Sequence, residues 1–317
     1  MPQDIYANLS KRIGKLRMNQ KPIPSQKLFW AFSGLGIAVL FWAINTVIAK
    51  GVISQIPPMA LSFFRWLVAL IFIFPFAFKG LKRDINAIRE NLGSLLVLSI
   101  TSVAIYNSVL YMGAQYTSAT NIALVVAAMP AMTLTFAWMI LKHRPKVLQT
   151  LGIMVSLGGV VVIISKGSFS KFATFHFNPG DLLILLSISS WSLYSVLLKK
   201  KGIPISPISF LTMTIILGTL CILPFYLWEY FLYKGFEVNW AIVWMFIFLG
   251  ICPSILSYFC WNYGVNTVGS ATASVFMYLI PVFTSAIAYF FLGERLFAYH
   301  LAGGVLIFCG LILSSRN

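Results

Sequence analysis

The chain has 317 residues, of which 59% are hydrophobic and 9% are charged, and its formal net charge is +16. Its mean hydropathy is +0.89. A water-soluble domain of this size does not sustain such values, so the composition predicts an integral membrane protein. The four cysteines lie inside apolar runs, which is typical of small buried residues and not of a disulfide framework or a metal site.

Residues 1–27 form a polar segment with six basic residues and a single acid, Asp4. Apolar residues recur in it every three or four positions, so a helix here would have one apolar stripe and one cationic face. Such a helix suits an anionic membrane surface, and a disordered basic tail is the alternative. A cleaved signal peptide is disfavoured, because the apolar run that follows has full membrane length and no small-residue cleavage site after it.

Ten apolar segments follow the tail. Most of them are close to the ~20 residues that a helix needs to cross the hydrocarbon of a bilayer. The connections are short and leave no room for a soluble domain. The expected spans are residues 29–48, 59–78, 92–112, 119–141, 147–164, 181–198, 208–228, 240–263, 271–292 and 299–313.

The second half of the chain repeats the first. An offset of 151 residues aligns Pro281 with Pro130, and an offset of 149 residues nearer the start of each half aligns Trp191 with Trp42. Matches at Trp, Pro, Gly and charged positions are informative because they do not arise easily among apolar residues, so two related halves are predicted. The expected organisation is a cytoplasmic basic tail (1–27), a first five-helix repeat (28–165), an external connector (166–180) and a second five-helix repeat (181–317).

The basic residues predict the orientation of the spans. With the N-terminus inside, 17 of the 23 Lys and Arg residues fall in cytoplasmic segments and five in external segments, while Arg65 lies within a span. The expected location is therefore the inner membrane of the cell, with both termini in the cytoplasm. The charge reflects membrane topology and not nucleic-acid binding. Five spans per half make the two halves inverted, which is typical of secondary transporters that alternate between two access states.

The residues that carry the repeat resemble a known family. SATNIALVVAAMP at 118–130, SATASVFMYLIP with LGERL at 270–296, and Arg65 early in the second span are similar to the EamA-type branch of the drug/metabolite transporter superfamily. The resemblance covers roughly residues 30–315. It implies an all-α membrane fold of ten helices around a central cavity, and export, less often import, of amino acids or other small metabolites. The first half departs from the Gly-Glu-Arg pattern, so a structural difference between the halves is expected at Glu294.

Polar and aromatic side chains inside the spans are candidates for a solute site at the middle of the membrane, because lipid does not tolerate them. Aromatic walls with amide groups suit a small zwitterion or amphiphile. The alternative is structural, since Ser, Thr and Asn also bridge helices and Trp and Tyr also lie at the headgroup level. Repeat partners are favoured. The candidate substrate-binding residues are Trp42, Asn45, Arg65, Tyr106, Asn107, Asn121, Trp191, Tyr194, Tyr258, Trp261, Asn262 and Tyr278.

Arg65 needs a partner, because an unpaired charge within a span costs at least about 2.5–3.5 kcal/mol. No Asp or Glu is expected near the middle of the membrane, which leaves Glu294, helix-end carbonyls or an anionic group of the solute. A structural role is favoured over solute contact, since buried charges are most often satisfied within the protein. The same lack of buried acids disfavours carboxylate-driven proton coupling, and facilitated efflux or exchange is the simpler expectation.

Two further features concern helix shape. Pro130 and Pro281 lie in twin spans and each should bend its helix, either as a hinge for gating or as a static kink. Several glycines predict close helix packing and not a phosphate loop, because no Walker Lys-Ser/Thr follows them. They are Gly152, Gly158, Gly159, Gly303, Gly304 and Gly310.

Catalysis is not predicted, because HExxH, GxSxG and GxGD motifs are absent and the three histidines are scattered. Neither a cofactor nor a metal is expected. The predicted function is secondary transport of small metabolites, with export of amino acids or related compounds favoured. An uptake permease of the same fold is the alternative, followed by a receptor or scaffold, which would not require an inverted repeat. The expected partners are the solute and the bilayer, and oligomeric state is left open.

Overall fold

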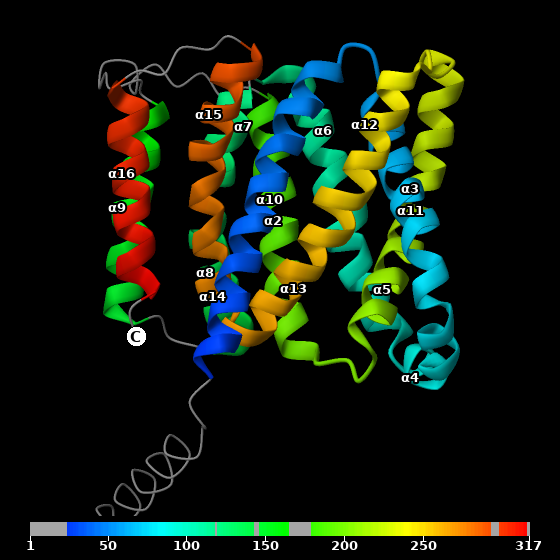
Figure 1. Ribbon diagram of the computed structural model, residues 1–317, viewed down its shortest axis with the longest axis horizontal. Coiled ribbons are helices and arrows are strands. Elements are labelled where there is room, and N and C mark those ends of the chain that lie inside the picture. The colour runs from blue at the N-terminus through cyan, green and yellow to red at the C-terminus, as the bar shows by residue number, and fades with distance from the viewer. Residues whose placement is uncertain (1–23, 118, 143–145, 165–178, 293–297, 316–317) are drawn as a thin grey trace, which may run out of the picture.

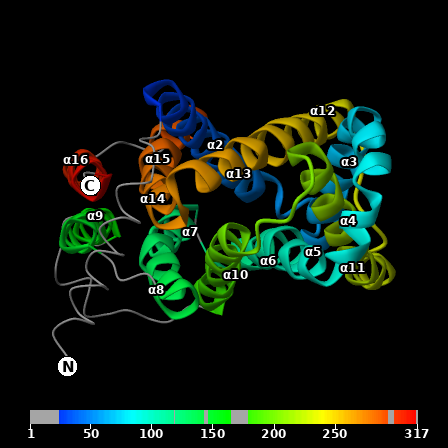
Figure 2. The ribbon, with the colours of Figure 1, turned by 90° about the horizontal axis from the view of Figure 1, so that it is seen from below.

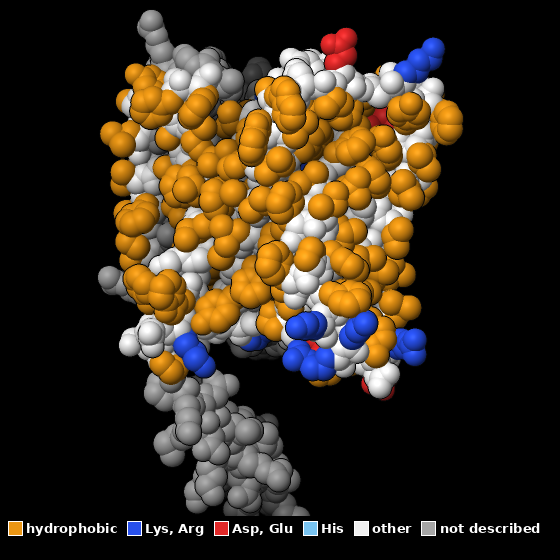
Figure 3. Space-filling model, turned by 45° about the vertical axis from the view of Figure 1, so that its right-hand side comes forward, with side chains coloured by type: hydrophobic (Ala, Val, Ile, Leu, Met, Phe, Trp, Pro, Cys, Tyr) orange, Lys and Arg blue, Asp and Glu red, His pale blue; other side chains and the backbone are white. Residues whose placement is uncertain are grey.

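The computed structural model describes residues 24–117, 119–142, 146–164, 179–292 and 298–315, and these are helical with no strand among them. Seven of the described helices are long and apolar enough to cross a membrane. They lie side by side as one bundle (Figure 1). Large apolar side chains cover the flank of the bundle, and Lys and Arg gather at the end where the first helix begins (Figure 3). We call this the basic end and the other the opposite end. The chain is thus a multi-pass membrane protein.

The first three spans extend beyond the predicted bounds, typically by a turn, because flanking polar residues continue their helices, whereas the fourth and fifth, at 119–141 and 147–164, have the predicted bounds. A short helix, α4, was not predicted and follows the second span. In chain order they are α2 (Ser25–Val52), α3 (Pro58–Arg83), α4 (Ile85–Glu90), α5 (Leu92–Ser99), the π-helix η1 (Ile100–Ile105), α6 (Tyr106–Tyr116), α7 (Ala119–Val126), α8 (Met129–Leu141) and α9 (Val147–Ile164).

The second half has a similar order of elements. Prolines begin two of its helices, since their fixed φ suits the first turn and they lack the N–H that would be unpaired there. The elements are α10 (Pro179–Lys201), α11 (Pro207–Tyr233), α12 (Trp240–Gly250), the π-helix η3 (Ile251–Leu256), α13 (Ser257–Val268), α14 (Ser270–Val275), the 3-10 helix η4 (Phe276–Tyr278), α15 (Leu279–Leu292) and α16 (Ala298–Ser315).

Two of the membrane-length helices contain a six-residue π-helix. It occupies Ile100–Ile105 between α5 and α6, and Ile251–Leu256 between α12 and α13. A π-helix shifts the hydrogen-bond register by one residue, and it frequently marks a functional position. The altered register leaves the carbonyls of Ser102 and Pro253 able to accept side-chain donors, as described below.

Two other spans are interrupted just before their proline. A turn at residues 127–128 separates α7 from α8, which has Pro130 in its first turn. The short 3-10 helix η4 separates α14 from α15, where Pro281 lies. The interruption expected from the missing proline N–H is present in both spans, while the hinge motion stays a prediction.

Helices α9 and α16 pack against each other at the edge of the bundle (Figure 2). A Cβ at Gly159 would lie 2.6 Å from the carbonyl oxygen of Gly303, and a Cβ at Gly310 would lie 2.5 Å from that of Gly152. Real Cβ atoms do not approach so closely, so these glycines permit the contact, as predicted. The prediction is wrong for Gly158, where a Cβ would meet nothing within 4 Å, because this residue lies on a face that the other helix does not cover.

Candidate functional site

An aromatic cluster occupies the middle of the bundle. The rings of Trp42 on α2 and Trp191 on α10 lie 5.0 Å apart between centroids, and Tyr258 on α13 lies 5.0 Å from Trp191. Each aromatic pair of this kind adds about 0.5–1.5 kcal/mol beyond the burial of its area. No member is more than 5% exposed. The cluster consists of Trp42, Tyr106, Trp191, Tyr194, Tyr258 and Trp261, all of them predicted site residues.

The guanidinium of Arg65 on α3 lies fully buried beside this cluster. Its donors meet oxygens of α2, α6 and the π-helix η3, and none of the acceptors that the described residues supply is a carboxylate. A π-helix carbonyl and side-chain dipoles therefore solvate the charge, which fits the structural role favoured from the sequence. The acceptors are Ser254 Oγ (2.6 Å), Asn107 Oδ1 (2.7 Å), Tyr111 OH (2.7 Å), Pro253 O (3.0 Å) and Asn45 Oδ1 (3.4 Å).

Two tyrosine–asparagine pairs flank the cluster. The hydroxyl of Tyr111 donates to Asn45 Oδ1 over 2.8 Å, about two turns before α2 ends at the opposite end of the bundle. The hydroxyl of Tyr194 donates to Asn262 Oδ1 over 2.6 Å, about two turns before α10 ends at the basic end. Arg65 Nη1 contacts both members of the first pair. The first pair is therefore held by one more side chain than the second.

The carbonyls of the two π-helices receive different donors. Pro253 O accepts the indole N–H of Trp42 over 2.9 Å. Ser102 O accepts the hydroxyl of Tyr258 over 2.6 Å and the amide of Asn107 over 3.3 Å. Among the residues that the structure describes, the fully buried indole N–H of Trp191 has no partner. Leaving a buried donor unpaired costs about 1–3 kcal/mol, so this group needs an explanation.

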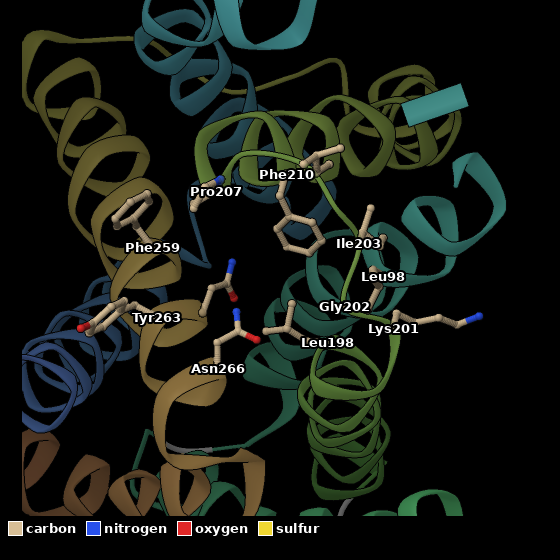
Figure 4. Close-up of a pocket in the computed structure, with 12 residues that line it drawn as sticks. Leu98, Leu198, Lys201, Gly202, Ile203, Pro207, Phe210, Phe259, Tyr263 and Asn266 are labelled. Atoms are coloured by element: carbon tan, nitrogen blue, oxygen red, sulfur yellow. The ribbon is translucent and has the colours of Figure 1, made fainter. Parts of the chain in front are cut away.

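A cavity of about 410 Å³ opens at the basic end between α5, α10, α11 and α13. We call it the basic-end vestibule. The side chain of Asn266 points into this cavity and the ring of Phe210 faces it, whereas the side chain of Lys201 points away (Figure 4). Asn262 also lines it, so this vestibule reaches the Tyr194–Asn262 pair.

A second cavity, of about 540 Å³, opens at the opposite end and is called the opposite vestibule. Its wall is formed by the loop after α2, the start of α3, the end of α6 and the end of α11. Neither Asn45 nor Tyr111 lines it. Its lining includes Ser54, Pro58, Met112, Gln115 and Glu229.

Glu229 is a buried acid within α11 that corrects the sequence prediction. Its two carboxylate oxygens accept the backbone N–H groups of Met59 (3.0 Å) and Ala60 (2.7 Å) at the start of α3. The predicted span ended at Trp228, so the acid was placed outside the membrane; the helix continues to Tyr233. The expected lack of a buried acid is therefore wrong at this helix end, whereas none of the acids in the described part of the chain lies near the middle of a membrane-length helix. The apolar residues on both sides of Glu229 were the available signal.

A carboxylate also caps the other end of the same helix pair. At the basic end Asp84 Oδ2, just after α3, accepts the backbone N–H (2.9 Å) and the hydroxyl (2.8 Å) of Ser206, where α11 begins. The backbone bond from Ser206, with a smaller effect of Arg83, lowers the pKa of Asp84 well below its usual range. Helices α3 and α11 are antiparallel, and each ends in a carboxylate that stabilises the N-terminus of the other.

Two lysines bind helix C-termini in a similar manner. Lys50 at the end of α2 donates to the carbonyls of Ala114 (3.0 Å) and Thr117 (2.9 Å) near the end of α6. Lys199 at the end of α10 donates to the carbonyl of Asn266 (2.6 Å) near the end of α13. Both ammonium groups complement the negative end of a helix dipole.

The remaining predicted site residues lie elsewhere. The hydroxyl of Tyr278 donates to Ile153 O over 3.5 Å, and its ring packs in a separate small cluster with Ala127 and Ile307. The side chain of Asn121 and the whole of Glu294 are outside the residues described. Pro130 is buried at the start of α8.

Membrane-length helices with an aromatic and polar centre and a cavity at each end define the transporter class of membrane proteins. A sequence model of the EamA-like transporter family matches residues 28–165 and again residues 178–316. The chain belongs to this family.

Relatives agree with this assignment. The uncharacterized transporter YyaM of Bacillus subtilis (strain 168) is 28% identical over 89% of this chain and 92% of its own length. An uncharacterized transporter of Archaeoglobus fulgidus is 26% identical over 89% of this chain and 96% of its own length. A solved structure, described only as the crystal structure of a protein, has a TM-score of 0.71 at 17% identity and covers 92% of this chain and 97% of its own. That likeness concerns the fold alone.

Proposed function

We propose that this protein is a secondary transporter that moves small metabolites by alternating access, and that it exports amino acids or related compounds. The observation that carries the proposal is the pair of vestibules on either side of the aromatic cluster. Their lining residues correspond at the offsets of the sequence repeat, 149 for Pro58 and Pro207, and 151 for Gln115 and Asn266. Twin cavities facing opposite sides are what an inverted repeat needs to open to each side in turn.

The fold proposed for this mechanism has ten crossings in two inverted sets of five. It is supported by the two π-helices, which start 151 residues apart at Ile100 and Ile251. It is also supported by Lys50 and Lys199, which are 149 residues apart. Lys50 binds the end of α6 and Lys199 binds the end of α13, and these two helices correspond in the repeat. Three shorter apolar helices accompany the seven long ones and would complete the ten.

The two tyrosine–asparagine pairs serve as gates in this scheme. Asn45 corresponds to Tyr194 at an offset of 149, and Tyr111 corresponds to Asn262 at an offset of 151. Each gate therefore has the same tyrosine–asparagine hydrogen bond, with the tyrosine and the asparagine in exchanged positions. The basic-end vestibule reaches the Tyr194–Asn262 gate, because Asn262 lines it. The gate on the side of the opposite vestibule, Tyr111–Asn45, is also bound by Arg65. Solute from the basic end therefore meets first the gate that is held by fewer hydrogen bonds.

The proposed location is the cell inner membrane with both termini in the cytoplasm. The gathering of Lys and Arg at the basic end supports it (Figure 3). The proposed solute site is the aromatic cluster with Asn45, Asn107 and Asn262, where rings can face an apolar body and amides can bind polar groups. Arg65, Asn121 and Tyr278 are the remaining proposed contacts, and Pro130 and Pro281 the proposed hinges.

The test uses purified protein in liposomes. Uptake of labelled solutes from a panel of amino acids and other metabolites shows transport directly, and raised tolerance to toxic amino-acid analogues on overexpression supports export. Solute that is bound tightly but never moved would favour a receptor, and accumulation in cells would favour uptake.

Alternation is measured separately with spin labels at twin positions. One pair, at Ser54 and Gln115, spans the opposite vestibule, and its twin pair, at Ile203 and Asn266, spans the basic-end vestibule. The native cysteines are replaced by alanine. Pulsed electron paramagnetic resonance should show two distances for each pair, with one vestibule widening as the other narrows. A single unchanged distance in both pairs contradicts alternating access.

A further inference from the structure

We propose that the indole N–H groups of Trp42 and Trp191 take turns on the two π-helix carbonyls, so that one bond defines each access state. In the present state Trp42 donates to Pro253 O. In the other state Trp191 donates to Ser102 O and the bond from Trp42 is broken. The inference rests on the proposed alternating access and names the contacts that switch.

The correspondence of four residues carries the argument. Trp191 is the partner of Trp42 at an offset of 149, and Ser102 is the partner of Pro253 at an offset of 151. If the two halves had the same conformation, Trp191 would bond to Ser102 O as Trp42 bonds to Pro253 O. It does not, and within the described part of the chain its buried N–H is unpaired. The two halves are therefore in different conformations at this contact.

The acceptor that Trp191 lacks is occupied by another donor. The hydroxyl of Tyr258 lies 2.6 Å from Ser102 O, and its ring lies 5.0 Å from that of Trp191. Tyr258 corresponds to Asn107, whose amide already lies within 3.3 Å of the same carbonyl. Exchange of the halves would move the Asn107 amide to Pro253 O as Tyr258 leaves Ser102 O. Each of the two carbonyls then has a side-chain donor in both states, and the bond from Arg65 to Pro253 O is the contact without a twin, since Thr214 stands at the corresponding position.

This arrangement keeps the two states close in free energy. Each state pairs one indole N–H and leaves the twin unpaired, so the desolvation cost of an unpaired donor is present in both and cancels between them. A carrier needs such a balance, because a ligand can shift an equilibrium only by its differential affinity for the two states. The unpaired N–H of Trp191 then indicates that this side chain has a second position in the other access state, and it is not a packing defect.

The test compares twin substitutions by the distances of the two spin-label pairs defined above. Trp42→Phe removes a bond of the present state only, and Trp191→Phe removes a bond of the other state only. The first should lower the population of the present state, recognised by its distance in each pair, about fivefold, the value of one ordinary hydrogen bond, and the second should raise it by a similar factor. Tyr258→Phe removes the shorter of the two bonds to Ser102 O, leaving the Asn107 amide there, and should act in the same direction as Trp42→Phe.

Trp66→Phe is the matched control. Its indole N–H is also buried without a partner among the described residues, and it corresponds to no π-helix donor, so the populations should not change. Shifts of Trp42→Phe and Trp191→Phe in the same direction, or no shift in either, would overturn the exchange. If Trp42→Phe does not fold, Tyr258→Phe against Trp191→Phe gives the same contrast.

Failure of this inference differs from failure of the proposed function. If the unsubstituted protein has two distances for each pair and transports solute, but the twin substitutions do not oppose each other, only the exchange is overturned. If the unsubstituted protein has one fixed distance in both pairs and moves no solute, the alternation and the exchange are both overturned.

Discussion

Replacing Arg65 shows how much the fold depends on the one fully buried cation among the residues that the structure describes. Arg65→Ala removes five donors, but most of the acceptors keep another partner. Pro253 O retains the indole of Trp42, and Asn45 Oδ1 retains the hydroxyl of Tyr111. The exception is Asn107 Oδ1, for which Arg65 is the partner that the described residues provide.

The expected loss of stability follows from the number of acceptors that are left without a partner. One orphaned buried acceptor costs about 1–3 kcal/mol, and the space left by the side chain adds to that cost. Release of a desolvated charge offsets part of it. We expect a net loss of about 2–4 kcal/mol in stability for Arg65→Ala. Arg65→Met keeps most of the volume and should lose less, and Arg65→Lys, which keeps the charge and up to three donors, should recover part of both stability and transport.

Thermal unfolding in detergent and solute uptake into liposomes measure the two effects on the same preparations. The expected order of melting temperature is wild type, then Arg65→Lys, then Arg65→Met, then Arg65→Ala. Wild-type stability and transport in Arg65→Ala would show that Arg65 has neither role. A melting temperature of Arg65→Met above that of wild type would show that desolvation of the charge outweighs its hydrogen bonds.

Three further substitutions test other contacts. Glu229→Gln keeps one side-chain oxygen, so one of the two backbone N–H groups at the start of α3 loses its acceptor. The free energy of unfolding should fall by about 1–2 kcal/mol, measured by thermal unfolding. An unchanged melting temperature would contradict this. Asp84→Asn should lower the melting temperature at pH 7. Because the folded pKa of Asp84 is lowered, its contribution is complete above the unfolded value of about 3.9 and is lost as the pH falls toward the folded pKa, so the difference from wild type should shrink only below about pH 4. Gly159→Leu should separate α9 from α16 and abolish a disulfide crosslink between cysteines introduced into the facing sides of the two helices, whereas Gly158→Leu, where a Cβ meets nothing within 4 Å, should leave the crosslink intact.

Much of the fold could be predicted from the sequence, because the length of an apolar run is a direct consequence of the thickness of the bilayer. The membership of the aromatic cluster was predicted for a related reason, since lipid excludes polar aromatic side chains from the middle of a span. The two tyrosine–asparagine contacts were also accessible from the sequence, because the repeat offsets align Asn45 with Tyr194 and Tyr111 with Asn262, and two residue types that exchange places suggest a conserved contact.

Other features depend on packing that a single sequence does not display. The segment from Ile100 to Ile105 has no residue pattern that distinguishes a π-helix from an α-helix, since the register is set by the neighbouring helices. Glu229 was misplaced because the predicted end of its span came five residues before the end of α11 at Tyr233. The error hid an acid whose charge is compensated by the start of another helix, a partner some 170 residues away that local pattern does not indicate.

The glycine contact between α9 and α16 also bears on the order in which the protein is made. Helix α9 ends at Ile164 and α16 begins at Ala298, and ribosomes add roughly 5–20 residues per second. The small-residue face of α9 therefore waits roughly seven to thirty seconds in the membrane before its partner is synthesised. During that time it is open to any other helix with small residues, including α9 of a neighbouring nascent chain, so insertion factors that shield this face would favour the correct pairing.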